Sequence, residues 1–534
     1  MKHSKYQKHI LDTLPYKENG IYKISALAGT GKTTTAKSLL KLLPEKKWLV
    51  LVFNKDNKDE WRKWQQKNMK ESIGNSEAHS FASFVMKMFP GYQWDWIKKP
   101  TKHDYKSLLE NESERVISNV KQIVERFEIS LEQNITQGFI ETVLMTIYST
   151  EIIEKYTHLA NKLWNAKCDP SQPQFSLSES AGMKLIYLKK EILPYDFVIW
   201  DEAQDIPDIH FAVMNKFKQQ SVHILFGDDY QSINLWRSGM NGQFNKLESF
   251  SELPQTYRFG NTLSCFVNSF MFIMDEKKLR KYDISMKGNS NIKTWVIDYN
   301  NLHSVPIHKH NYILYLVRAN RTMLLTLFYY GKIIQKTHYI DCKFTKTKAY
   351  SKQFLVNLRE LIEIKNEYKR FKYPSIWWKY NSWFDVQVDY ENDNLTETQM
   401  EIASIVVGRL GNIRTYLTLQ EIITNNDKKK SKFELSTVHG KKGAESDVVI
   451  VANDFLMENV ISNEFEEYCI FNTAITRAKK ILYYPSKYNE LRYYQKCVSK
   501  IQQAWTTYKE WKKTCIEILQ HRLPLELCEY IMKK

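Results

Sequence analysis

The feature that most constrains the fold of this chain is a glycine-rich turn that joins an apolar stretch to an amphipathic one. Residues 21–27 have the length and apolarity of a strand, and the segment from about Lys32 to Leu43 is typical of a helix that Pro44 ends. The turn between them contains Ala28-Gly29-Thr30-Gly31-Lys32-Thr33. A second apolar run follows at 47–53. The order strand, turn, helix, strand predicts a right-handed crossover and a parallel sheet.

The same turn has the pattern of a phosphate-binding loop, with Ala26 where the usual motif has its first glycine. Gly29 and Gly31 let backbone N–H groups face an anion at the start of a helix, where the helix dipole favours negative charge. In such loops the lysine reaches the β- and γ-phosphates, and the hydroxyl residue holds Mg²⁺. We therefore expect ATP and Mg²⁺ as ligands, with Thr33 on the metal. The residues predicted to bind the nucleotide here are Ala28, Gly29, Thr30, Gly31, Lys32, Thr33 and Thr34.

A later strand-like run, 197–200, ends in Asp201-Glu202-Ala203-Gln204-Asp205. An apolar strand that ends in two acids is the expected partner of a phosphate-binding loop. Asp201 is predicted to hold Mg²⁺, and Glu202 to orient and deprotonate the attacking water. A lone Asp-Glu pair at the end of a strand is commonly a solvated turn. The position downstream of the phosphate-binding loop favours the catalytic interpretation.

The net charge of +17 suits a polyanionic partner, because basic side chains that neutralise phosphates release condensed counterions. A lysine-rich genome gives the same excess, so charge alone leaves nucleic-acid binding open. The seven cysteines are dispersed without a CxxC pair, which predicts reduced thiols and neither a zinc nor an iron–sulfur site. No signal peptide or long apolar run is present, so we expect a soluble intracellular protein, cytoplasmic or nuclear.

Together, AGTGKT and DEAQD resemble the superfamily 1 helicases of the UvrD-like group, and especially the F-box DNA helicase branch. The resemblance extends over most of residues 1–485, through motifs in the family's order. It implies an ATP-driven motor that moves along single-stranded DNA and unwinds duplex junctions in repair, recombination or replication. It also implies 3′-to-5′ movement, although no residue in the sequence fixes the direction.

The resemblance adds residues to the nucleotide site. Gln7 stands where the family's glutamine recognises adenine, and Gln231 of Gly227-Asp228-Asp229-Tyr230-Gln231 stands where it senses the γ-phosphate. Three residues of the second half complete the set: Arg258 on the γ-phosphate, Glu445 on the ribose, and Arg477 as an arginine finger that stabilises the transition state. The implied catalytic residues are Lys32, Asp201, Glu202, Gln231, Arg258 and Arg477.

The resemblance also implies a set of nucleic-acid contacts. Phe53-Asn54-Lys55 resembles a motif that touches the strand, and Trp236 stands where the family stacks an aromatic ring on a base. The chain departs from the family pattern at Ala78, Ala444 and Ser446, which puts one backbone contact and some packing in question. The implied contact residues are Phe53, Asn54, His79, Trp236, Arg237, Thr437 and His439.

The spacing of further apolar runs predicts the domain organisation. We expect an α/β fold of two RecA-like P-loop NTPase domains with parallel sheets, each carrying a mainly helical insertion, followed by a helical tail. The expected boundaries are 1–90 and 191–255 for the first domain, 91–190 for its insertion, 256–344 and 431–485 for the second domain, 345–430 for its insertion, and 486–534 for the tail.

Several alternatives stay open at this level. A DNA helicase is the leading interpretation, and the alternatives are a motor that moves along RNA and a motor that strips proteins from DNA without unwinding. The second insertion interleaves basic residues with Trp377, Trp378 and Trp383, which are either core residues or nucleic-acid contacts. The stretch 523–531 faintly resembles an F-box core, which would bind a protein partner, but is also compatible with an ordinary terminal helix. The tail carries no nuclease signature.

Overall fold

The computed structural model divides into two compact units, residues 1–255 and 256–534. It describes residues 3–53, 55–69, 75–144, 149–234, 243–280, 283–319, 322–323, 326, 342–344, 352–367, 369–372, 375–392, 394–407, 433–456 and 464–489.

Unit 1 is built on a parallel sheet of six strands in the order β3-β2-β4-β5-β1-β6. Every residue of β2, β4 and β5 is buried, because helices cover both faces of the sheet. The strands are β1 (Gly20–Ala26), β2 (Trp48–Val52), β3 (Ser76–Ser80), β4 (Phe197–Asp201), β5 (Val222–Gly227) and β6 (Ser249–Leu253).

Side chains alternate between two cores on the two faces of this sheet. In β2, Leu49 and Leu51 join the core on one face, whereas Trp48 and Val50 join the core on the other. The helices are α1 (Lys5–Thr13), α2 (Lys32–Leu42), α3 (Lys55–Asn68), α4 (Phe81–Met88), α5 (Lys102–Leu108), α6 (Glu114–Ile129), α7 (Gln137–Leu144), α8 (Thr150–Lys167), α9 (Glu179–Lys189), η2 (Ala203–Asp205), α10 (Asp208–Phe217) and α12 (Gln243–Lys246).

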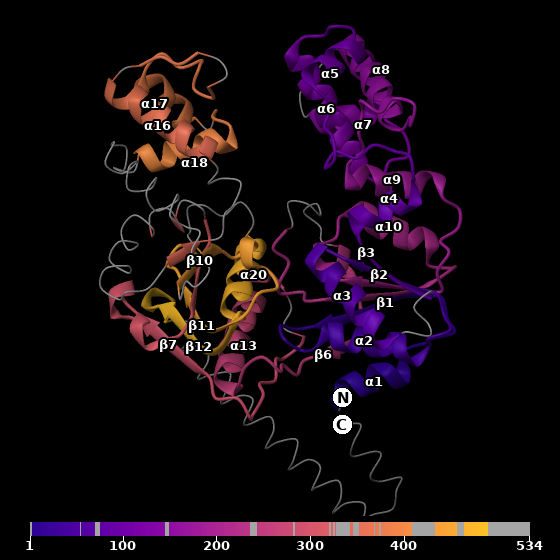
Figure 1. Ribbon diagram of the computed structural model, residues 1–534, viewed down its shortest axis with the longest axis vertical. Coiled ribbons are helices and arrows are strands. Elements are labelled where there is room, and N and C mark those ends of the chain that lie inside the picture. Colours follow the sequence, from indigo (N-terminus) through magenta and orange to yellow (C-terminus); the bar gives the residue numbers. More distant parts are fainter. Residues whose placement is uncertain are drawn as a thin grey trace, which may run out of the picture. The chain divides into compact units, whose positions relative to one another are not determined.

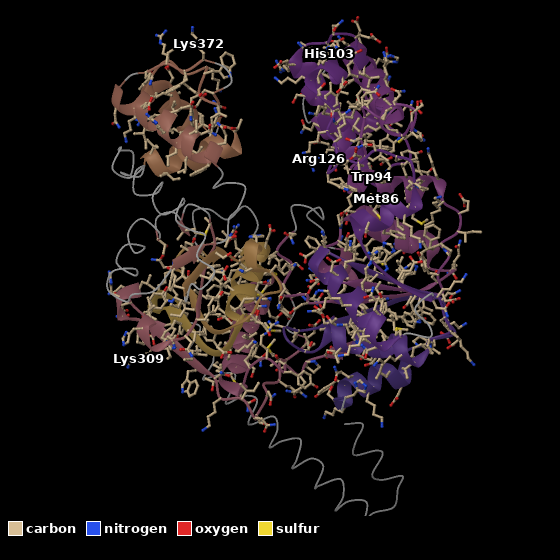
Figure 2. All side chains as sticks on the ribbon, in the orientation of Figure 1. Met86, Trp94, His103, Arg126, Lys309 and Lys372 are labelled. Atoms are coloured by element: carbon tan, nitrogen blue, oxygen red, sulfur yellow. The ribbon has the colours of Figure 1, made fainter. Side chains whose placement is uncertain are left out.

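The helical insertion of unit 1 shares one of these cores with the sheet. Figure 1 shows α4, α9 and α10 between the sheet and helices α5–α8. Trp94, labelled in Figure 2, is 2% exposed at this junction. Its backbone forms a parallel β-bridge with Leu177. A Cβ on Gly182 of α9 would lie 2.7 Å from Cβ of Val85 in α4, so the close approach of these helices needs glycine. The insertion is therefore firmly joined to the sheet.

Unit 2 has a second parallel sheet of six strands, in the order β7-β12-β11-β8-β10-β9. Its strands are β7 (Trp295–Tyr299), β8 (Ile313–Val317), β9 (Cys342–Phe344), β10 (Phe433–Thr437), β11 (Ser446–Val451) and β12 (Ala478–Pro485). The helices are α13 (Asn261–Glu276), η3 (Leu302–Ser304), η4 (Ile307–Lys309), α16 (Lys352–Glu367), α17 (Trp383–Glu391), α18 (Glu397–Ile405), η8 (His439–Lys441), α20 (Glu464–Ile475) and η9 (Ser486–Tyr488).

Two packing contacts hold unit 2 together locally. Phe270 of α13 stacks on Tyr468 of α20 with ring centroids 5.2 Å apart. Trp377 is fully buried beside α16, where its indole N–H donates to the Asn357 carbonyl at 2.8 Å. Trp378 is 56% exposed. The tryptophans of the second insertion therefore divide between core and surface.

The structure confirms the predicted fold class of two RecA-like α/β domains with parallel sheets. Strands β3, β6, β7 and β9 were not foreseen. The tail beyond residue 489 lies outside the described residues. In the ranges that the structure describes, no helix has the length and apolarity needed to cross a bilayer.

Candidate active site

Three loops of unit 1 meet at the carboxyl edge of its sheet. Strands β4, β5 and β1 are neighbours, and their register aligns Asp201 with Phe226 and Ser25 with Gly227. The phosphate-binding loop follows β1, the acidic loop follows β4, and the loop that begins at Gly227 follows β5. Ligands of open parallel sheets bind at this edge.

The phosphate-binding loop has the backbone that its glycines predict. Gly29 and Gly31 adopt φ of 70° and 83°, values that favour glycine. Ala26 is the last residue of β1. Its backbone is extended, so this position of the motif accepts alanine in place of glycine. Helix α2 begins at Lys32, whose ammonium donates to the Ala26 carbonyl at 3.3 Å. The lysine therefore lies folded over the loop.

The acidic loop is held by Gln204. Its side-chain amide donates from Nε2 to Glu202 Oε2 at 2.7 Å and to Asp205 Oδ2 at 3.2 Å, while Oε1 accepts from the Asp228 backbone N–H at 3.1 Å. Glu202 has φ of 56°, a left-handed conformation that costs a non-glycine residue about 1–3 kcal/mol. One glutamine thus joins the loops after β4 and β5 and orients the strained glutamate.

Two buried carboxylates face the cation of Lys32. Burial, and next the charge of Glu202, raise the pKa of Asp201, whereas Lys32 lowers it. Burial raises the pKa of Asp228 to about 6, again against the effect of Lys32. Asp228 Oδ2 is buried and has no hydrogen-bond partner among the residues that the structure describes. A carboxyl cluster of this kind is suited to a further cation.

A buried ion pair anchors the loop after β5. Lys23 Nζ lies 2.8 Å from Asp229 Oδ1, and the two side chains are 1% and 2% exposed. Ser25 donates to the second carboxylate oxygen at 2.8 Å. Gly227 leaves room for this packing, since a Cβ there would lie 2.4 Å from the ring of Phe244. The loop that carries Gln231 is therefore tied to β1.

Gln7 lies against the helix that follows the phosphate-binding loop. Its Nε2 donates to Thr35 Oγ1 of α2 at 3.2 Å, and its Oε1 accepts from the Ser4 backbone N–H at 3.0 Å as part of a capping box. The side chain is 4% exposed. The amide keeps a second Nε2 hydrogen and a second Oε1 lone pair, so adenine recognition by Gln7 does not require either of these bonds to break.

The three site residues expected in unit 2 lie together. Arg258 donates from Nε to Glu445 Oε2 at 2.7 Å and from an η nitrogen to the Thr476 carbonyl at 2.8 Å. Burial raises the pKa of Glu445, but Arg258 and Lys479 more than offset this effect and leave the pKa lowered. Arg477 is 3% exposed and donates to the Thr473 carbonyl at 2.9 Å. In unit 2 the Arg258 guanidinium thus pairs with an ionised Glu445, and the buried Arg477 lies beside them, where it donates to the Ala444 carbonyl at 3.4 Å.

The expected nucleic-acid contacts are spread over both units. Phe53 follows β2 and is half-buried, and His79 of β3 bonds Glu77 through Nε2 at 2.9 Å. Burial lowers the pKa of His79 despite this carboxylate. Thr437 ends β10 and accepts from the Gly440 N–H at 3.1 Å, with His439 beside it. Asn54, Trp236 and Arg237 lie outside the described residues.

Comparison with known proteins shows the family to which the chain belongs. The family model described as UvrD-like helicase C-terminal domain matches residues 47–488. The chain belongs to the UvrD-like helicase family. The assignment made from the motifs is thereby confirmed. The match begins after the phosphate-binding loop, so the candidate nucleotide site rests on the chain's own sequence and geometry.

One curated protein adds detail. The chain is 23% identical over 510 residues to F-box DNA helicase protein 1 of Schizosaccharomyces pombe, a match that covers 86% of this chain and 55% of the relative. The chain therefore spans about half the length of the relative that it matches.

Sequence reasoning assigned no role to three residues that organise the site of this helicase. Gln204 stands inside DEAQD, and Asp228 directly follows the glycine after β5, so their motifs contained a signal. Lys23 carried no signal, because its role depends on Asp229, far away in the sequence.

Proposed function

We propose that this protein is an ATP-dependent translocase that moves 3′-to-5′ on single-stranded DNA and unwinds duplex DNA. The observation that supports it most strongly is the convergence of Lys32, Asp201 and Glu202 at one edge of the unit 1 sheet, with Gln204 orienting the glutamate. Because the chain belongs to a helicase family, we assign the energy of ATP hydrolysis at this site to movement along DNA.

The residues of unit 1 fit ATP with Mg²⁺. In the part of the chain that the structure describes, no group of three or more His, Cys, Asp or Glu side chains is arranged to hold a metal ion by itself. Mg²⁺ in such sites is typically held by one or two carboxylates together with substrate phosphates. Asp201 and Thr33 would hold it, and the buried Asp228 carboxylate adds negative charge nearby. When bound, the ion neutralises charge on the phosphates.

Each side chain then has a step in hydrolysis. Lys32 neutralises the β- and γ-phosphates, and Glu202 takes a proton from the attacking water. Gln204 keeps the Glu202 carboxylate aimed through its bond from Nε2. Arg258 and Arg477 supply positive charge to the transferring phosphoryl group, and Glu445 binds the ribose. Similarity to F-box DNA helicase protein 1 favours DNA over RNA as the track.

ATP hydrolysis in the presence of single strands tests this proposal. We expect single-stranded DNA to stimulate phosphate release, and 3′-tailed duplexes to be unwound in preference to 5′-tailed ones. If only RNA stimulates hydrolysis, the protein moves along RNA and not along DNA. Displacement of a bound protein block without strand separation would make the protein a stripping translocase. An F-box-type partner is a separate proposal, tested by co-purification with and without residues 523–531.

A further inference from the structure

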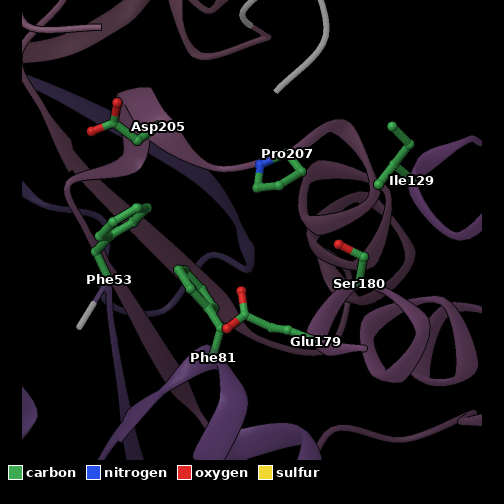
Figure 3. Close-up of a pocket in the computed structure, with 7 residues that line it drawn as sticks. All are labelled: Phe53, Phe81, Ile129, Glu179, Ser180, Asp205 and Pro207. Atoms are coloured by element: carbon green, nitrogen blue, oxygen red, sulfur yellow. The ribbon is translucent and has the colours of Figure 1, made fainter. Parts of the chain in front are cut away.

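Unit 1 has pockets on two sides of strands β2 and β3. One lies beside Phe53, where the carboxyl edge of the sheet meets the helical insertion (Figure 3), and belongs to the expected nucleic-acid surface. Another, of about 390 Å³, lies between β3 and α3. Helix α3 contributes Arg62, Gln65 and Gln66 to its lining, and β3 contributes residues 76–79. This second pocket, called the β3 pocket below, has no role in the nucleotide site.

The β3 pocket follows the outer edge of the unit 1 sheet. Strand β3 comes first in the order of that sheet, and within the described ranges it pairs with β2 alone. Successive side chains of a strand point to opposite faces, so four consecutive residues line one pocket when that pocket lies against the edge. An edge strand presents backbone N–H and C=O groups with which another strand can pair. The β3 pocket is therefore placed to receive an extended peptide.

Hydrogen-bond donors gather in the β3 pocket. Arg62 and Gln65 are three residues apart on α3, so their side chains are neighbours. Arg62 donates from Nε to the Ala78 carbonyl at 3.1 Å, which shows that the backbone of Ala78 faces the pocket. Gln65 is 3% exposed, and its buried Nε2 has no hydrogen-bond partner in the part of the chain that the structure describes. An unpaired buried donor is costly, so an acceptor on a ligand would bind there favourably.

The charges of the β3 pocket favour a carboxylate as that acceptor. The bond from Arg62 to Ala78 uses one of the five guanidinium N–H groups, so the others can bind an anion. The acid in the lining, Glu77, already forms ion pairs with Lys87 and, at 2.9 Å, with His79. Its charge is therefore offset. A guanidinium beside an unpaired amide donor is suited to a carboxylate, because charge-assisted hydrogen bonds are the strong ones.

We propose that the outer edge of β3 binds an extended, acidic segment of a partner protein. The segment would add to the sheet as a further strand and place a Glu or Asp carboxylate on Arg62 and Gln65. A peptide N–H would replace Arg62 at the Ala78 carbonyl, and the released guanidinium would bind the carboxylate with two parallel bonds.

A nucleic acid suits this edge less well than a peptide. Its backbone has no N–H group to donate to the Ala78 carbonyl. The β3 pocket also extends back to Ser76, the first residue of β3, and so away from the carboxyl edge where the single strand is expected. The proposal goes beyond the motor activity, because binding of the segment needs neither ATP nor DNA.

Fluorescence anisotropy with labelled octapeptides tests the proposal on the full chain. The peptides alternate threonine and serine and are amidated, and one carries a central glutamate where the other carries glutamine. We expect the Kd of the glutamate peptide to be about tenfold or more below that of the glutamine peptide. A third peptide has no glutamate but a free C-terminus. If it binds more tightly than the glutamate peptide, the pocket takes a chain end and the proposed side-chain carboxylate is wrong.

Two substitutions in the β3 pocket separate binding from folding. Gln65→Leu replaces an unpaired buried donor with an apolar group of similar size, so the melting temperature should stay the same or rise. The Kd of the glutamate peptide should nevertheless rise by about tenfold. Arg62→Gln should bring the Kd values of the glutamate and glutamine peptides within about twofold of each other. Lys63→Gln is the matched control, because Lys63 is exposed on the same helix and lies outside the lining.

Four results would overturn the proposal. Two are equal Kd values of the glutamate and glutamine peptides for the wild type, and a folded Gln65→Leu variant with wild-type affinity. A third is a loss of oligo-dT affinity in Gln65→Leu and Arg62→Gln, but not in Lys63→Gln, because the pocket would then take nucleic acid. The fourth is a dimer, seen by sedimentation, that Arg62→Gln dissociates, because a second copy of the chain would then occupy the edge.

Discussion

Gln204→Glu is the substitution that most sharply tests how the acidic loop works. The glutamate keeps an oxygen able to accept from the Asp228 N–H, which Gln204 Oε1 binds at 3.1 Å. It loses the Nε2 donor that lies 2.7 Å from Glu202 Oε2 and 3.2 Å from Asp205 Oδ2. The variant therefore keeps the acceptor for the Asp228 N–H, and in place of the donor that aims the catalytic carboxylate it puts an oxygen that repels Glu202 and Asp205.

The magnitude follows from the bond that is lost. A hydrogen bond to a charged group contributes about 1.5–3 kcal/mol, and each 1.36 kcal/mol is about tenfold in rate. Loss of the bond to Glu202 should slow hydrolysis by about 10- to 150-fold. The effect should appear in kcat, with the Kd for a fluorescent ATP analogue changed little, because the bonds of Gln204 described above go to Glu202, Asp205 and Asp228 and not to the phosphate-binding loop.

Steady-state phosphate release at saturating ATP and single-stranded DNA gives kcat. Gln219→Glu is the matched control, since Gln219 is an exposed residue just beyond α10 and the charge change is the same. A Gln204→Glu variant with the kcat of Gln219→Glu would refute the assigned role of Gln204.

Three further predictions concern residues away from that amide. Lys23→Met leaves Asp229 buried without its cation, so urea denaturation should show that the free energy of unfolding of unit 1 falls by about 3–5 kcal/mol. A fall of less than about 1 kcal/mol would contradict the stabilising role of the ion pair. Burial lowers the pKa of His223 to about 4, so below its ordinary value of about 6.5 the unfolded chain binds a proton that the folded chain does not. This histidine alone should therefore lower the free energy of unfolding by about 2 kcal/mol between pH 7 and pH 5. In His223→Asn, the free energy of unfolding should change less over the same pH range. Arg258→Lys replaces the two spaced guanidinium donors that bond Glu445 and the Thr476 carbonyl with one compact ammonium, so kcat should fall about tenfold or more. An unchanged kcat would argue against the assigned role of Arg258.

The parts of the fold that the sequence predicted are those with two buried faces. Strands β2 and β4 are buried along their whole length, so both appear as continuous apolar runs. Strands β3 and β7 were missed because they contain polar or exposed residues, such as Glu77 in β3 and the 52% exposed Trp295 in β7. Neighbouring strands stabilise them, and that stabilisation is a tertiary effect.

The candidate site likewise contains residues that the sequence predicted and contacts that it did not. Lys32 and Asp201 stand in local motifs whose spacing alone predicts their chemistry. The bond between Gln204 and the Asp228 N–H joins loops that follow different strands, and no local pattern predicts it. The same holds for the pocket beside Phe53, since its lining comes from the sheet edge and from helices α4, α6, α9 and η2, which are distant in sequence.

The most direct test of the central claim is strand displacement on 3′-tailed and 5′-tailed duplexes, with ATP and Mg²⁺, by the wild type and by Lys32→Ala. The wild type should separate the 3′-tailed duplex, and Lys32→Ala should bind the single-stranded tail but separate nothing. Equal displacement by the two proteins, or displacement by the wild type without ATP, would contradict a motor driven from the phosphate-binding loop.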